Sequence, residues 1–245
     1  MRRVFIVENK LEILTERWEF QRSIKNLMGK YSNMIILNRE GEIFKNFWSN
    51  RGDNCLAFND GYYKGKAVEK YYKSVEKRNA LVAVLLQKKF PDKIGKMSTE
   101  EIYGIGPFKV KPLSSPVIEI AEDGETAKGL WYCQGACNEI EGSGPVARWT
   151  WGYFAVDFMR EEDEFKIWHL CYFNDVDCIS GTSWGKPEKK LPILEEFAVL
   201  KDFSYENFSK EVCLYEKYHV NRKLAKIPKI PEPYNTFKNT FSYGY

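Results

Sequence analysis

Two long stretches of β-branched and aromatic residues, separated only by a short acidic turn, constrain the fold of this chain most strongly. They cover residues 146–160 and 164–175. Such stretches are typical of strands, and so short a turn joins them as an antiparallel hairpin. Residues 149–158 are apolar on both faces of the predicted strand, so we expect both faces of the sheet to be covered.

Upstream of this hairpin the sequence predicts further strands and, before them, helices. Residues 116–121, a turn at Asp123-Gly124 and residues 126–137 have the pattern of another hairpin. Apolar residues three and four positions apart predict helices over residues 20–35, 43–48 and 65–75. Residues 76–116 are predicted to be a helical insertion that ends in a Gly- and Pro-rich loop. Helices followed by an antiparallel meander are typical of the α+β class.

Length and charge exclude several classes of protein. The chain has 245 residues, with 37 Lys and Arg against 34 Asp and Glu, which allows a real core and argues against a nucleic-acid-binding surface. The longest apolar stretch, near residues 80–86, is far shorter than the ~20 residues of a membrane-spanning helix, so no membrane partner is expected. No phosphate-binding or dinucleotide fingerprint occurs, and we expect no cofactor.

Cysteine usage and the N-terminal sequence indicate a cytoplasmic location. Glu8 and Glu12 interrupt the first apolar run before a secretion signal can develop. The six cysteines are scattered along the chain, which fits free thiols in a reducing compartment. Cys133 and Cys137 would lie ~13 Å apart on a strand at ~3.3 Å per residue, so no metal site is predicted.

A group of sequence motifs resembles a known family. They are a helix ending in Tyr31, the run DGYYKGKAVEKYY at residues 60–72, TAKGLW at 126–131 and the strand pair at 149–170. Together they resemble the SnoaL-like branch of the nuclear transport factor 2-like superfamily. The resemblance implies three helices and a curved antiparallel sheet that form a cone around a deep, mostly apolar pocket. This family contains dehydratases, isomerases, epoxide hydrolases, polyketide cyclases and non-catalytic binding proteins.

The resemblance also divides the chain. We expect the cone domain over residues 1–190, with the insertion at 76–116, and a C-terminal extension over 191–245. Residues 217–245 carry six Lys and Arg against a single Glu, with several prolines and a terminal group of aromatic residues. That composition predicts an extended arm on a surface. The outer sheet face and this arm are the expected contacts of a homo-oligomer, a dimer or a trimer.

His169 is the first candidate for proton transfer. It alternates with Phe165, Ile167, Cys171 and Phe173, which predicts that all five side chains point to one face. A histidine on an apolar face is either a hydrogen-bonded core residue or a proton carrier in a pocket. The resemblance favours the second interpretation, because dehydratases and cyclases of the superfamily often use an interior histidine.

Tyr31 and Asp157 are the other two catalytic candidates. Relatives carry a pocket tyrosine at the position of Tyr31 that bonds a substrate oxygen; packing on the amphipathic helix is the alternative. Those relatives add an aspartate shortly after it, where this chain has an apolar run and only Asn38 as a polar substitute. Asp157, in apolar surroundings in mid-strand, is either the displaced acid or a structural or interface residue.

Several further residues are candidates for substrate binding. Arg148 is a candidate clamp for a substrate carboxylate, and Cys171 shares the predicted face of His169. The dense aromatic residues of the predicted strands line either a pocket for a flat ligand or a sheet–sheet interface; they include Trp131, Trp149, Trp151 and Tyr153.

The sequence therefore predicts a cofactor-independent lyase or isomerase that acts on a hydrophobic aromatic or polycyclic small molecule. His169 would move the proton, Tyr31 would polarise a substrate oxygen, and Asp157 and Asn38 would orient them. The alternative is a non-catalytic small-molecule-binding or assembly protein, which the missing aspartate favours.

Overall fold

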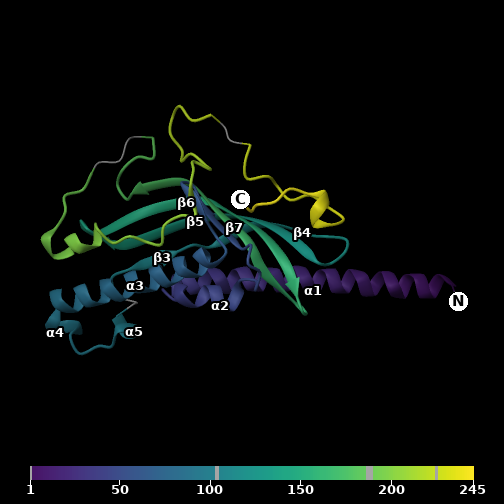
Figure 1. The fold of residues 1–245 in the computed structure, drawn as a ribbon, viewed down its shortest axis with the longest axis horizontal. Helices are drawn as coiled ribbons and strands as arrows, with labels where there is room; N and C mark the ends of the chain where they lie inside the picture. The colour runs from purple at the N-terminus through teal and green to yellow at the C-terminus, as the bar shows by residue number, and fades with distance from the viewer. Residues whose placement is uncertain (1, 103–104, 186–189, 224–225) are drawn as a thin grey trace.

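The computed structural model describes residues 2–102, 105–185, 190–223 and 226–245. Helices come first and strands follow, so the predicted α+β class is confirmed (Figure 1). The α-helices are α1 (Arg2–Ile36), α2 (Ile43–Phe47), α3 (Lys66–Lys89), α4 (Pro91–Ile94) and α5 (Thr99–Ile102), with 3-10 turns at Glu40–Glu42, Glu195–Leu200 and Phe237–Asn239.

Eight strands in the described residues form one curved sheet that does not close. They are β1 (Cys55–Phe58), β2 (Gly61–Lys64), β3 (Phe108–Val110), β4 (Leu113–Ile120), β5 (Thr126–Glu141), β6 (Gly144–Glu161), β7 (Glu164–Ile179) and β8 (Lys210–Glu211). The order is β3-β5-β6-β7-β1-β2-β8, and β4 also pairs with β5. Because β1 runs parallel to β7, the sheet is mixed, which corrects the expected purely antiparallel arrangement.

The long hairpins predicted from the sequence form the centre of this sheet. β5 pairs with β6 and β6 with β7 over almost their whole lengths. Their turns use residues with positive φ, Gly144 at 90° and Glu162 at 56°, which the tight reversal of a hairpin requires. Each of these strands is a few residues longer than the sequence predicted.

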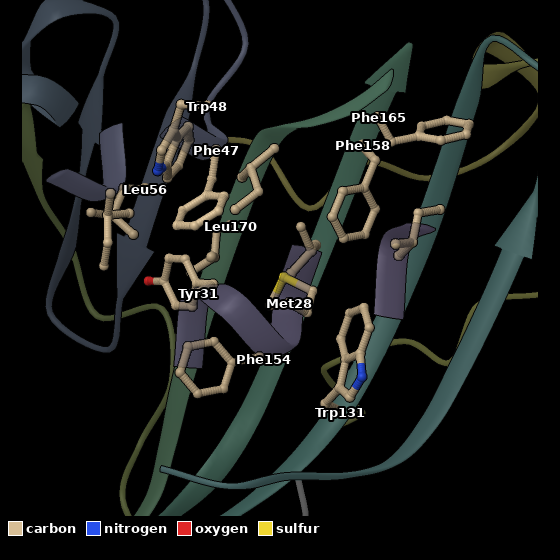
Figure 2. Packing of buried hydrophobic residues seen from close by; sticks show 14 of the residues in the cluster. Met28, Tyr31, Phe47, Trp48, Leu56, Trp131, Phe154, Phe158, Phe165 and Leu170 are labelled. Carbon is tan, nitrogen blue, oxygen red and sulfur yellow. The ribbon is translucent and has the colours of Figure 1, made fainter. Parts of the chain in front are cut away.

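The sheet has two covered faces, as the apolar strands required. The helix face carries Phe154, Phe158 and Leu170, which pack with Met28 and Tyr31 of α1 in the main core (Figure 2). Helices α1, α2 and α3 all lie on this side of the sheet (Figure 1). The aromatic and aliphatic residues that face them remove much of this side of the sheet from water.

The opposite side, the arm face, carries Ala155, Cys171 and Phe173. The C-terminal arm, described over residues 212–223 and 226–245, runs along this side of the sheet (Figure 1). Its Tyr215 and Tyr243 pack against the arm-face residues. The arm has almost no regular structure of its own, and backbone hydrogen bonds such as Tyr218 N–H to Asp175 O, at 2.7 Å, hold it in place. The predicted extended arm is confirmed.

Residues 54–116 differ most from the expectation. The hairpin β1–β2 lies in a stretch that the sequence analysis left without strands, and α3 continues through Glu76 to Lys89 without a break. The segment predicted as a loop contains β3 and the start of β4. Among the helices of the described ranges, none has the length and apolar content needed to cross a membrane.

Candidate active site

A β-bulge in β7 decides which face of the sheet His169 occupies. Asp157 pairs with His169, but Phe158, the next residue of β6, pairs with Ile167, so Trp168 is an extra residue in β7. Ile167 therefore packs in the helix-face core, while His169 lies under the C-terminal arm. The predicted alternation is wrong here, because one extra residue reverses the facing of everything before it.

His169 and Asp157 form a buried cluster with a residue that the sequence analysis missed, Lys128 of β5. The Asp157 carboxylate lies 2.5 Å from Lys128 Nζ through Oδ1 and 2.9 Å from His169 Nδ1 through Oδ2. Lys128 and Asp157 are fully buried. The cluster follows from strand register, because Lys128 pairs with Asp157, which pairs with His169.

The C-terminal arm closes this cluster from the outside. Tyr243 N–H donates to Asp157 Oδ2 at 2.7 Å, and Ser242 Oγ donates to the same atom at 3.2 Å. The Lys128 ammonium faces aromatic rings of the arm, with Phe241 at 4.5 Å and Phe237 at 4.6 Å. Burial lowers the pKa of Lys128, although Asp157 opposes that shift.

A cavity lies on the other side of the sheet, between the helices and β5–β7. It encloses about 690 Å³ of empty space, counted out to its open mouth. Its walls are mostly apolar and aromatic, and a few polar side chains converge inside, which is the ordinary composition of a small-molecule site. Its polar lining includes Tyr31, Tyr72, Lys111, Glu139 and Tyr172.

Tyr31 is the one catalytic candidate from the sequence that lines this cavity. Its hydroxyl lies 3.2 Å from the hydroxyl of Tyr72, on α3. Burial raises the pKa of Tyr31 to about 12 and that of Tyr72 well above its usual value of 10. Both hydroxyls are therefore protonated at neutral pH and act as hydrogen-bond donors or acceptors rather than as bases.

Lys111 and Tyr172 form the cationic part of the cavity. The Lys111 ammonium lies 4.1 Å from the centre of the Tyr172 ring. Burial acts to lower the pKa of Lys111, but attraction to Tyr172, Cys133 and Glu139 outweighs it and the pKa is raised, so the amine stays charged. The Tyr172 hydroxyl is buried and forms no hydrogen bond of normal geometry with the described residues, although Lys111 and Thr150 lie close enough to oppose the rise that burial causes in its pKa.

Two carboxylates lie at the same cavity. Glu139 of β5 is half-buried and is close enough to Lys111 to raise its pKa. Glu40 forms a buried ion pair with Lys109, 2.6 Å from Oε1 to Nζ. Since Glu40 is already neutralised by its own lysine, Glu139 is the carboxylate available to a ligand.

The remaining substrate-binding candidates do not line the cavity. Trp131 packs in the helix-face core, and Cys171 Sγ donates to Tyr243 O under the arm. Tyr153 packs on Tyr132 at 5.0 Å between ring centres, and Trp151 packs on Trp184 at 4.8 Å. Trp149 is 46% exposed, Asn38 is buried, and Arg148 pairs with Asp177 at 2.9 Å.

The predicted catalytic set is thus divided by the sheet. Tyr31 lies in the helix-face cavity, whereas His169 and Asp157 lie together behind β5–β7 under the arm. Sequence reasoning missed Lys111 because it lies in the segment interpreted as a loop, and missed Glu139 because the predicted strand ended at residue 137. The signal for Lys111 is the alternation of Lys109, Lys111 and Leu113 across β3 and β4.

Comparisons with known proteins give similar solved structures. A protein from Novosphingobium aromaticivorans with the provisional name scytalone dehydratase is 10% identical, with a TM-score of 0.48, covering 69% of this chain and 93% of its own. A hexachlorocyclohexane dehydrochlorinase from Novosphingobium barchaimii is 12% identical, with a TM-score of 0.46 and coverages of 71% and 99%. A protein of unknown function from Mycobacterium tuberculosis is 12% identical, with a TM-score of 0.45 and coverages of 78% and 89%.

The dehydratase and the dehydrochlorinase are members of the superfamily that the sequence motifs resemble. No family model matches the chain, and no curated protein matches it.

Proposed function

We propose that the helix-face cavity binds a hydrophobic, aromatic or polycyclic small molecule and acts on it as a cofactor-independent lyase or isomerase. The observation that carries this is the buried Tyr172 hydroxyl, which lines the cavity beside the Lys111 ammonium and forms no hydrogen bond of normal geometry with the described residues. A buried hydroxyl left without a partner costs ~1–3 kcal/mol. A ligand oxygen at this point removes that cost and gains the charge of Lys111.

The same arrangement stabilises a developing negative charge. In the proposed reaction Glu139 takes a proton from the carbon next to a substrate carbonyl, and the electron pair of that C–H bond moves onto the carbonyl oxygen. Lys111 and Tyr172 donate hydrogen bonds to this enolate oxygen, in surroundings where water competes little. The pKa values of the cavity tyrosines are too high for them to be the base at neutral pH, which leaves this role to the carboxylate.

The enolate can react further in two ways, which differ in where its electron pair moves. Return of the proton from Glu139 to a more distant carbon shifts the double bond and completes an isomerisation. Loss of a hydroxyl group from the neighbouring carbon, with the proton supplied by Glu139, forms a double bond and releases water. Both routes balance without an oxidant or reductant, and Tyr31 and Tyr72 can bond the departing oxygen.

The experiment follows the first step with a general probe. We expect the protein to accelerate exchange of the α-hydrogens of 2-tetralone with deuterated water, measured by proton NMR, and to bind 2-tetralone in isothermal titration calorimetry. Glu139→Gln removes the base, so it abolishes exchange and keeps binding. Lys111→Met removes the oxyanion partner, so it weakens both.

The controls separate the alternatives. Circular dichroism confirms that each variant is folded, and His169→Asn tests the buried cluster behind the sheet. Loss of exchange in a folded His169→Asn variant, with exchange retained in Glu139→Gln, would assign the chemistry to that cluster and contradict the proposal. Binding without exchange would favour the second candidate function, a non-catalytic small-molecule-binding protein; no binding at all would overturn both.

A further inference from the structure

A second hollow adjoins the mouth of the helix-face cavity and has no part in the proposed reaction. It is a shallow aromatic depression of about 740 Å³, including open space, and we call it the vestibule. Phe58, Tyr63, Tyr71, Tyr205 and Phe208 supply its rings. Three of these, Phe58, Tyr71 and Tyr205, also line the cavity, so the two hollows lie side by side.

The rings of the vestibule are arranged as a connected series rather than as isolated side chains. Tyr63 lies 4.7 Å from Phe208 and 4.8 Å from Tyr71, and Tyr71 lies 6.1 Å from Tyr205, measured between ring centres. Tyr63 is almost completely buried and forms part of the base, whereas Tyr205 is 39% exposed. An exposed ring at the junction of two hollows leaves a flat apolar face open to a ligand.

The segment that carries Tyr205 is fixed at both ends. Glu206 N–H donates to Ser74 Oγ of α3 at 3.2 Å, and Ser209 N–H donates to Tyr62 O of β2 at 2.8 Å. Residues 203–208 are therefore held against the helix-face cavity, although they belong to the C-terminal extension. Because this segment is already ordered before a ligand binds, less conformational entropy is lost on binding.

We infer that the vestibule is a second binding compartment, and that the ligand is an elongated, flat molecule with two aromatic rings. This inference rests on the proposed function. The oxygen-bearing ring lies in the cavity against Lys111 and Tyr172, and the distal ring stacks on the exposed face of Tyr205. Glu206 and Glu211 at the rim disfavour a negative charge there, so the distal ring is uncharged.

The size of the two spaces supports a ligand of this length. A single-ring molecule that occupies the cavity against Lys111 and Tyr172 gains nothing from the rings that belong to the vestibule alone, Tyr63 and Phe208. A second ring gains stacking energy with Tyr205, and aromatic pairs of this kind are worth ~0.5–1.5 kcal/mol beyond the area they bury. That energy corresponds to a difference in affinity of about twofold to twelvefold.

Calorimetric titration of two probes, 4-methylphenol and 4-phenylphenol, tests the inference. We expect Tyr205→Ala to weaken binding of 4-phenylphenol by about twofold to twelvefold and to change binding of 4-methylphenol by less than about twofold. The matched control is Tyr218→Ala, because Tyr218 is similarly exposed, at 42%, and belongs to the arm rather than to either hollow. Tyr218→Ala should affect neither probe.

The outcomes separate this inference from the function on which it rests. If Tyr205→Ala changes both probes equally, or neither, while Lys111→Met weakens both, the vestibule is overturned and the cavity assignment stands. If Lys111→Met changes neither probe, the cavity assignment fails, whatever Tyr205→Ala does. If wild type binds neither probe, both fail.

Discussion

Replacement of Tyr172 by Phe should make the protein more stable and, at the same time, worse at holding a ligand. The substitution removes one buried hydroxyl that forms no hydrogen bond of normal geometry with the described residues. It keeps the ring, which packs 4.7 Å from Phe154 and lies beneath the Lys111 ammonium. The ring contacts are therefore unchanged, and the main effect is that the cost of burying the hydroxyl is removed.

The magnitude follows from that cost. A buried hydroxyl without a partner costs ~1–3 kcal/mol, and water entering the cavity recovers part of it, so the lower end applies. We expect the free energy of unfolding to rise by ~1 kcal/mol, which for a chain of this size raises the melting temperature by ~2–4 °C. The assay is urea denaturation followed by circular dichroism, together with a thermal melt.

Tyr31→Phe is the matched control, because Tyr31 lines the same cavity and is equally buried but its hydroxyl bonds Tyr72 at 3.2 Å. Loss of that hydrogen bond should lower the free energy of unfolding by ~0.5–1.5 kcal/mol. Changes of opposite sign in the free energy of unfolding of the two variants would support the assignment of the Tyr172 hydroxyl as a hydrogen-bonding group for a ligand. A Tyr172→Phe variant that is less stable than wild type would show that the hydroxyl has a partner, and the reasoning would be refuted.

Three further predictions concern the rest of the molecule. Lys128→Met should lower the free energy of unfolding by ~3 kcal/mol, measured by urea denaturation, because it leaves the buried Asp157 carboxylate without its ion-pair partner. A loss below ~1 kcal/mol would contradict the burial of the pair. Tyr31 and Tyr205, with pKa values of about 12 against 10 in the unfolded chain, keep their protons longer when folded. They therefore add stability that is fully present below pH ~10 and is lost as the pH rises toward ~12. In a pH titration, the absorbance of tyrosinate should rise together with the loss of the folded circular dichroism signal. Ionisation of both tyrosines at pH ~10 in the folded protein would disprove this. In the native protein a thiol-specific disulfide reagent should react rapidly at Cys213, which is the exposed one of the six cysteines. All six cysteines should react after denaturation. Rapid reaction of Cys171 in the native state would mean that the arm does not cover it.

The sequence predicted the elements of the sheet better than it predicted the composition of the site. Long aromatic and β-branched stretches specify β5, β6 and β7 by local pattern alone, and these strands are confirmed with only their ends extended. The face of His169, in contrast, depends on one extra residue at Trp168, and strict alternation has no signal for a bulge. A single displaced residue was enough to move the predicted proton carrier from one side of the sheet to the other.

Site residues could be predicted where a local sequence pattern fixes their position, and were missed where contacts between distant segments fix it. Tyr31 ends a strongly periodic helix, and its placement at the cavity agrees with the prediction, while its role stays a prediction. Lys111 lies in the short connection between β3 and β4, and Glu139 lies near the end of β5, where pairing partners rather than local composition decide the structure. The parallel pairing of β1 with β7 is likewise a long-range contact that no local pattern in residues 55–58 reveals.

The arm over the buried Lys128–Asp157 pair has a consequence for synthesis on the ribosome. β7 ends at Ile179, whereas the residue that caps Asp157 is Tyr243. At about 5–20 residues per second, the interval between them lasts roughly 3–13 s. During that time Lys128 and the apolar residues of the arm face are open to water. The newly made sheet is therefore prone to aggregate until the C-terminal arm has been synthesised and covers this face.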